Sequence, residues 1–125
     1  MNTKRLLSLI AIILGSVGVT LLFFPQEWIS YFLMEDSSVL LLQLIGAMYF
    51  AFAMLNWMYK ENTIGGIYGR PVAMANFTHF FIAALTFIKL WATDPGNFPL
   101  IIATLSYSVF AFAFAYLLFF KKDIK

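Results

Sequence analysis

The stretch LLSLIAIILGSVGVTLLFF, residues 6–24, decides the fold, because it contains no charged side chain from end to end. A helix needs about 20 apolar residues to cross the roughly 30 Å hydrocarbon core of a bilayer. Three further stretches meet that requirement, namely residues 38–59, 71–91 and 98–120, with Lys89 as their single charge. The sequence therefore predicts an all-α polytopic membrane protein, a bundle of four transmembrane helices.

The composition supports a membrane as the solvent. Of the 125 residues, 62% are hydrophobic and 11% are charged, whereas about 25% are charged in an average soluble domain. A soluble globule of this composition would expose large apolar patches. The length indicates a single domain, residues 1–125. The absence of cysteine excludes disulfides and thiolate metal sites, and a net charge of +2 is too small for a nucleic-acid-binding surface.

The connection between the first two spans, residues 25–36, reads PQEWISYFLMED. Its apolar and polar residues alternate with a helical period. We interpret it as an amphipathic outer loop at the headgroup level, with Trp28 and Tyr31 as interfacial anchors.

Basic residues indicate the orientation of the chain. Seven of the eight Lys and Arg side chains would lie on one side of the membrane, and only Lys89 on the other. The seven are Lys4, Arg5, Lys60, Arg70, Lys121, Lys122 and Lys125. Because short cytoplasmic loops are enriched in Lys and Arg, both termini are predicted to be cytoplasmic. A bacterial inner membrane is the expected location.

Polar residues inside two spans recur at steps of three and four, so each set lies on one helix face. The first set is Gln43, Gly46, Tyr49, Ala53 and Asn56, and the second is Asn76, His79, Ala83 and Thr86. Lipid offers no hydrogen-bond partners, and the two sets occur at similar heights, so the two faces are expected to meet. Gln43 and Thr86 would then be polar contacts between helices.

The segment NTIGGIYGRP, residues 62–71, leads directly into the third span. Its glycines permit tight turns and close approach to a ligand, and Arg70 stands beside a helix N-terminus, which favours anions. These features favour a lipid or a small anionic or amphiphilic ligand, bound near the cytoplasmic leaflet. The expected ligand-binding residues are Tyr49, Asn56, Arg70, Asn76 and His79. A tight turn carrying an ordinary cytoplasmic arginine is the alternative.

Other functions stay open. The polar faces could instead line a homo-oligomeric pore, or the chain could be an accessory subunit of a membrane complex. An enzyme is less favoured, because no carboxylate lies at depth to orient His79 as a base for Ser106 or Ser108. His79 could also be structural, hydrogen-bonded within the bundle. One histidine without cysteine cannot form a zinc site in one chain, and no cofactor is specified. Membrane lipids are the expected partners.

The first and fourth spans carry small residues at helical spacing, which allow close helix packing. They are Ala11, Gly15 and Gly18 in the first span, and Thr104, Ser108, Ala111 and Ala115 in the fourth. The large residues of the fourth span are expected to face mostly lipid or neighbouring subunits. They are Phe110, Phe112, Phe114 and Phe119.

The plan of the chain resembles the DoxX-like group of small four-helix bacterial membrane proteins. The shared features are a first span ending in Phe24-Pro25, an amphipathic outer loop, and the glycine-containing stretch QLIGAMY, residues 43–49. The resemblance implies four short spans. Some members are linked to respiratory or redox accessory roles. The stretch GGIYGRP, residues 65–71, is not part of the resemblance, and no functional residue is carried over from the group.

Overall fold

The computed structural model describes residues 2–32, 38–62 and 69–120. Its elements are α1 (Thr3–Phe23), α2 (Pro25–Phe32), α3 (Val39–Tyr59), α4 (Gly69–Thr93), α5 (Phe98–Ala115) and a π-helical turn, η2 (Tyr116–Phe120). These described parts contain no strand, so the all-α prediction is confirmed for them. Four helices are long and apolar enough to cross a membrane, and they match the four predicted spans to within a few residues.

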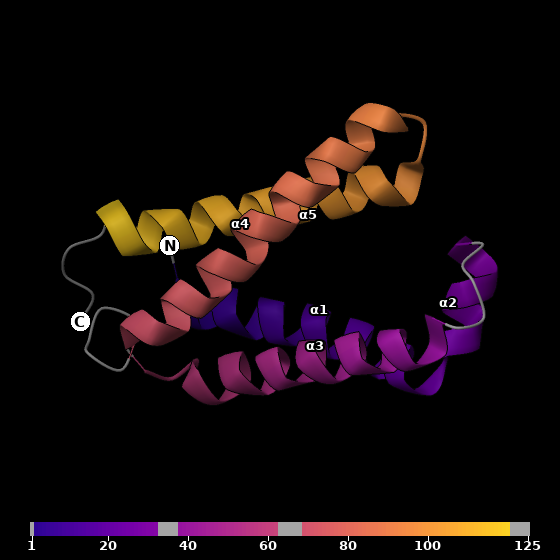
Figure 1. The fold of residues 1–125 in the computed structure, drawn as a ribbon. Helices are drawn as coiled ribbons and strands as arrows, with labels where there is room; N and C mark the ends of the chain where they lie inside the picture. Colours follow the sequence, from indigo (N-terminus) through magenta and orange to yellow (C-terminus); the bar gives the residue numbers. More distant parts are fainter. Residues whose placement is uncertain (1, 33–37, 63–68, 121–125) are drawn as a thin grey trace. The chain divides into compact units, whose positions relative to one another are not determined.

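The chain divides into two compact units, Met1–Asn62 and Thr63–Lys125. Figure 1 shows that the first unit contains α1, α2 and α3, and that the second contains α4 and α5. The long helices of each unit run antiparallel to each other. The predicted single domain and the predicted bundle of four helices would each include both units, so both stay predictions.

Short local signals begin and end the helices. The side chain of Asn2 accepts a hydrogen bond from the backbone N–H of Arg5 at 3.3 Å, and so caps the start of α1. Pro25 is the first residue of α2, where a missing N–H costs nothing, and α1 ends at Phe23. Asn97 caps α5 in the same way through the N–H of Leu100. Pro25 therefore closes the first span as predicted.

In the first unit, α1 and α3 pack through glycine. A Cβ atom added to Gly18 would stand 2.8 Å from the carbonyl oxygen of Gly46, and one added to Gly46 would stand 2.9 Å from the carbonyl oxygen of Gly18. One helical turn away, Gly15 faces the Cβ of Ala53 at 3.4 Å. The expected close packing of the small residues of α1 is confirmed, and its partner is α3.

This packing corrects one interpretation of the sequence. The face of α3 that carries Gly46 and Ala53 was expected to meet the span 71–91, but it lies against α1. Both helices are apolar on most sides, so their sequences mark no single packing face. The close fit of Gly18 to Gly46 selects the contact, because van der Waals packing replaces the hydrophobic effect between helices in lipid.

The helix α2 is held at the end of α1 and α3 mainly by Ile29. Ile29 is buried and forms a cluster with Leu21 of α1 and Leu42 of α3, and the partly buried Trp28 packs against the same cluster. Tyr31, by contrast, is 72% exposed. Residues 25–32 of the predicted amphipathic segment thus form a helix, residues 33–36 lie outside the described parts, and the amphipathic position at the headgroup level stays a prediction.

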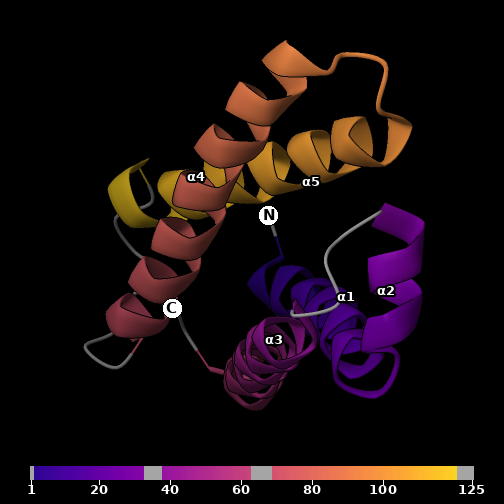
Figure 2. The same ribbon diagram turned by 45° about the vertical axis from the view of Figure 1, so that its right-hand side comes forward.

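Aromatic rings hold the second unit together, where α4 crosses α5 at an angle (Figures 1 and 2). Phe80 of α4 is fully buried, and its ring centroid lies 5.0 to 6.1 Å from the rings of Tyr107, Phe110 and Phe114. The expectation that Phe110 and Phe114 face lipid is wrong, since they are only 7% and 0% exposed. These two rings supply the volume that fills the space between the crossing helices.

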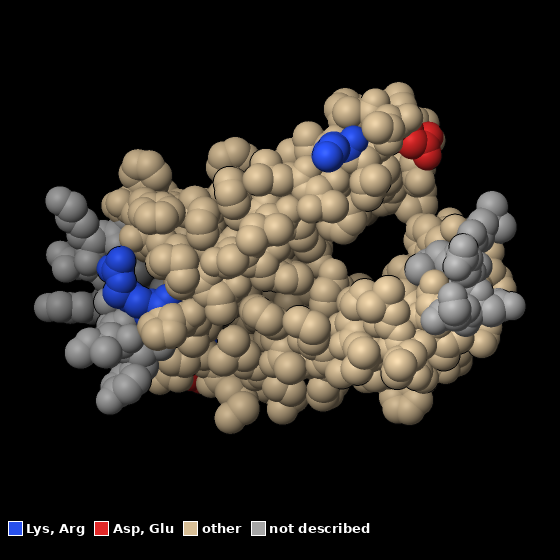
Figure 3. Space-filling model, in the orientation of Figure 1, with Lys and Arg blue, Asp and Glu red and all other residues tan. Residues whose placement is uncertain are grey.

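The remaining large aromatics of the fourth span do face outward. Phe112 is 77% exposed and Phe119 is 61% exposed. Charged side chains avoid the long apolar surfaces of the helices. On the face shown in Figure 3, blue and red atoms occur only near helix ends. This distribution suits helices whose middle parts lie in hydrocarbon.

Candidate functional site

Asn56 is the most buried polar side chain of α3, with no exposed surface. Its Nδ2 donates a hydrogen bond to the carbonyl oxygen of Phe52, four residues earlier, at 2.8 Å. That bond uses one of the two amide hydrogens, and an asparagine amide can make further bonds through the other hydrogen and its oxygen. One hydrogen of the Asn56 amide is therefore satisfied by a backbone carbonyl of the same helix.

The other two polar residues of α3 contact the rest of the first unit. Gln43 donates a long hydrogen bond, 3.4 Å, from Nε2 to the carbonyl oxygen of Leu22 in α1. Tyr49 is partly buried and packs against the cluster of Leu21, Ile29 and Leu42. The polar contact of Gln43 thus reaches α1, whereas the sequence interpretation placed it opposite Thr86.

In the second unit, α4 repeats the arrangement of α3. Asn76 is fully buried, and its Nδ2 donates to the carbonyl oxygen of Val72 at 2.9 Å. Thr86 is exposed, and its hydroxyl donates to the carbonyl oxygen of Ile82 at 3.0 Å. Both bonds stay within α4, which is how polar side chains are accommodated in an apolar helix.

His79 lies one turn beyond Asn76, half-buried among aromatic rings. Its ring centroid is 5.0 Å from that of Phe80 and 5.6 Å from that of Tyr107 on α5. Tyr107 is 8% exposed, and sequence reasoning missed it as a neighbour of His79. The signal was present, because a tyrosine in the middle of an apolar span carries a hydroxyl that needs a partner at depth.

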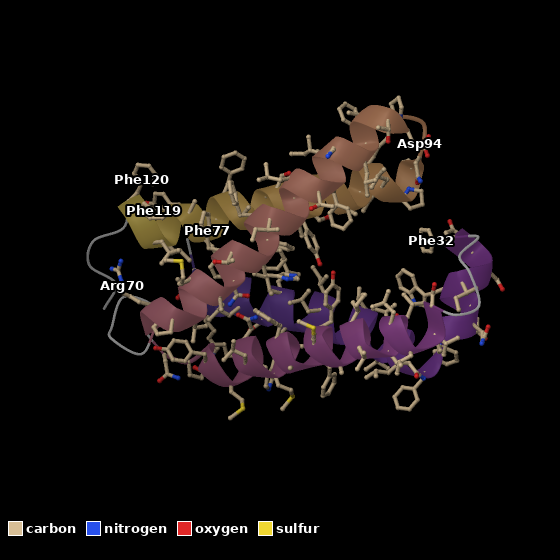
Figure 4. The ribbon with its side chains drawn as sticks, viewed as in Figure 1. Phe32, Arg70, Phe77, Asp94, Phe119 and Phe120 are labelled. Atoms are coloured by element: carbon tan, nitrogen blue, oxygen red, sulfur yellow. The ribbon has the colours of Figure 1, made fainter. Side chains whose placement is uncertain are left out.

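Arg70 is exposed at the second residue of α4 (Figure 4). The free N–H groups of a helix N-terminus favour an anion there. The rest of the predicted glycine-rich loop, residues 63–68, lies outside the described parts of the chain. In the first unit, the Nζ of Lys60 stands 3.0 Å from the centre of the Trp57 ring. The predicted anion site therefore stays a prediction.

The predicted site residues are divided between the two units. Tyr49 and Asn56 belong to α3 of the first unit, and Arg70, Asn76 and His79 belong to α4 of the second. The pocket expected from the sequence combines the two sets, so it stays a prediction.

An ion pair joins the start of α1 to the turn that follows α3. The Nζ of Lys4 lies 2.8 Å from a carboxylate oxygen of Glu61, and both side chains are more than half exposed. The hydrogen bond from Lys4 is the main cause that lowers the pKa of Glu61 below its usual value of 4.5. Slight desolvation opposes it, and the charges of Lys4 and Lys60 add to the lowering. The pair therefore persists to lower pH than an isolated carboxylate would allow.

Two of the hollows on the surfaces of the units are lined mainly by apolar side chains. One lies along the end of α1 and α2, measures about 470 Å³, and is lined by Thr20, Phe24, Glu27, Trp28, Tyr31 and Phe32. The other lies along α4 and α5, measures about 240 Å³, and is lined by Phe77, Phe81, Ala84, Leu85, Ile88, Ser108, Ala111, Phe112 and Ala115. Within residues 2–32, 38–62 and 69–120, no three His, Cys, Asp or Glu side chains gather as metal ligands would.

Comparison with known proteins adds no assignment. No family model matches the chain, and no curated protein or solved structure matches it either. The resemblance to DoxX-like proteins therefore stays a prediction, and the function is argued from the residues alone.

Proposed function

We propose that the chain is an integral membrane protein that binds a lipid or a small anionic or amphiphilic ligand. The observation that carries the proposal is the complete burial of two amide side chains, Asn56 and Asn76, in helices long and apolar enough to cross a membrane. Hydrocarbon offers no hydrogen-bond partners, so polar side chains of membrane-length helices turn towards protein groups or a bound ligand.

The ligand-binding residues of the proposal are Tyr49, Asn56, Arg70, Asn76 and His79. Asn56 lies three residues before the end of α3, about 5 Å along the helix, and Asn76 lies seven residues after the start of α4, about 10 Å along it. Both amides would therefore stand near the same membrane surface as Arg70. The amides and imidazole would bind a polar headgroup, and the guanidinium would pair with its negative charge.

The proposed orientation places both termini and Arg70 in the cytoplasm, because seven of the eight basic residues then lie on that side. The ligand would enter from the cytoplasmic leaflet of a bacterial inner membrane. Acidic lipids of that leaflet would be attracted by Arg70 and Lys60.

Native mass spectrometry of the purified protein tests the proposal, because it reports retained ligand and subunit number together. Arg70→Ala and His79→Gln should each reduce the lipid retained per chain by about tenfold, the effect of losing roughly one charge-assisted hydrogen bond. Arg5→Ala and Ile82→Ala are the matched controls, since both residues are exposed and lie outside the proposed site. They should retain lipid as the native protein does.

The two quantities that this experiment measures test two different hypotheses. Unchanged lipid in both site variants would overturn the ligand proposal, provided that their unfolding midpoints match the native protein. The same spectra weigh the homo-oligomeric pore that the sequence left open. A strictly monomeric mass removes that alternative.

A further inference from the structure

The hollow beside α2 has a composition that the predicted site does not share. Four aromatic rings line it, those of Phe24, Trp28, Tyr31 and Phe32, and one acid, Glu27, stands among them. Apart from Phe24 and Thr20, these residues belong to α2. The hollow therefore lies entirely within the first unit, at the end of α1.

Helical spacing and ring packing shape this hollow. Glu27 and Tyr31 are four residues apart in α2, so they share one face of that helix, and Phe24 stands just before its start. Trp28 and Phe32 are stacked with ring centroids 5.3 Å apart, and Tyr31 meets Phe32 edge-on at 4.9 Å. This aromatic wall is braced by its own rings, and Ile29 on the opposite side holds α2 in place.

The aromatic rings and Glu27 favour a positively charged ligand. The faces of aromatic rings attract cations, and a carboxylate attracts them further, so an ammonium group suits both. An anionic headgroup would meet Glu27 and be repelled. Glu27 also lines the neighbouring hollow together with Gln26, Ser30 and Tyr31, so it stands on the ridge between the two and can reach a ligand from either side.

The size and position of the hollow indicate a small ligand with an apolar tail. Its volume, about 470 Å³, lies in the usual range of roughly 300–1,000 Å³ for small-molecule sites. It opens at the end of α1, a helix long and apolar enough to cross a membrane. A ligand seated there can place its charged head among the rings and extend an apolar tail along α1.

The geometry points to a binding site for a cationic amphiphile, with an ammonium head held by Glu27, Trp28 and Tyr31. The site shares no residue with the polar site proposed above, and its preference is for the opposite charge. The two proposals can therefore fail separately.

Fluorescence of Trp28 provides the test. Trp57→Phe and Trp91→Phe leave Trp28 as the single tryptophan of the three in the chain. The protein, in neutral maltoside micelles, is titrated with dodecyltrimethylammonium below its micelle concentration, and in parallel with dodecyl sulfate, which has the same tail and the opposite charge. We expect saturable binding of the ammonium probe, about tenfold tighter than any response to the sulfate probe.

Substitutions then assign the binding to the proposed residues. Glu27→Gln and Tyr31→Leu should each weaken binding of dodecyltrimethylammonium by about tenfold, and Glu27→Asp, which keeps the charge, should retain most of it. Asp94→Asn and Phe23→Leu are matched controls, because this exposed acid and this exposed ring do not line the hollow. Both should bind the probe as the native protein does.

Two results would overturn the site. One is equal response to the two probes, and the other is unchanged binding in Glu27→Gln. Either result would mean that these rings form only the aromatic belt common at membrane surfaces. Neither result would bear on the polar site proposed above, which is tested separately by the lipid retained in Arg70→Ala.

Discussion

Two glycines carry much of the specificity of the first unit. A Cβ atom at Gly18 would approach backbone atoms of Gly46 and Phe50 within 3.0 Å, and these cannot move aside as a flexible side chain would. Gly15 differs, because an added Cβ would only reach the Cβ of Ala53 at 3.4 Å. The same residue type therefore has different importance at positions three residues apart.

Gly18→Ala is predicted to lower the free energy of unfolding by about 1–3 kcal/mol, because α1 and α3 must separate to admit the methyl group. Gly15→Ala, the matched control, should change it by less than about 1 kcal/mol in either direction, since alanine favours the helix and the contact is ordinary. Denaturant titration of the purified proteins in one detergent, followed by circular dichroism, measures both. Equal losses in the two variants would contradict the glycine contact.

At the scale of helices, the two units pack by different means. In the first, α1 and α3 approach closely through glycine and alanine. In the second, α4 and α5 are spaced by rings, and Phe77 of α4 also meets Phe119 of η2 edge-on at 5.7 Å (Figure 4). Small residues permit close approach, whereas aromatic rings fill the wider space of an angled crossing.

Phe114→Ala is predicted to cost roughly 3–5 kcal/mol of unfolding free energy, because it opens a cavity beneath Phe80. Phe112→Ala removes the same ring two residues away, where the side chain is 77% exposed, and should cost much less. Thermal unfolding in detergent distinguishes the pair. If both variants lost equal stability, the assignment of Phe114 to the core of the second unit would be wrong.

For the whole molecule, the main question is which side of the membrane each helix end occupies. The described connections differ in the charges that they carry. Lys60 and Glu61 follow α3, and Asp94 stands in the turn between α4 and α5. The count of basic residues over the full chain predicts that the turn after α3 is cytoplasmic and that Asp94 lies on the other side.

The absence of cysteine makes this orientation measurable with single substitutions. Asp94→Cys should be labelled by a membrane-impermeant maleimide in intact spheroplasts, and Asn62→Cys only after the membrane is permeabilised. Both positions are exposed in the structure, so burial does not limit the reaction. The reverse pattern would invert the topology and move Arg70 to the outer surface.

The sequence by itself determined the number of membrane-length helices and their approximate bounds. These properties are local, because each helix satisfies its own backbone hydrogen bonds in hydrocarbon, and Pro25 and Asn97 act on their nearest neighbours. The polar positions of the candidate site were also visible, since an amide such as Asn56 stands out in an apolar segment.

Only the tertiary structure decided which faces meet. Helices that are apolar all round show no stripe that points to a core, so the sequence could not reveal that Gly46 lies on Gly18 or that Phe114 lies on Phe80. Those contacts depend on how closely two backbones can approach, and on whether a ring fills the space that remains. The hollow beside α2 also depends on a tertiary contact, because the docking of Ile29 holds α2 at the end of α1 and α3.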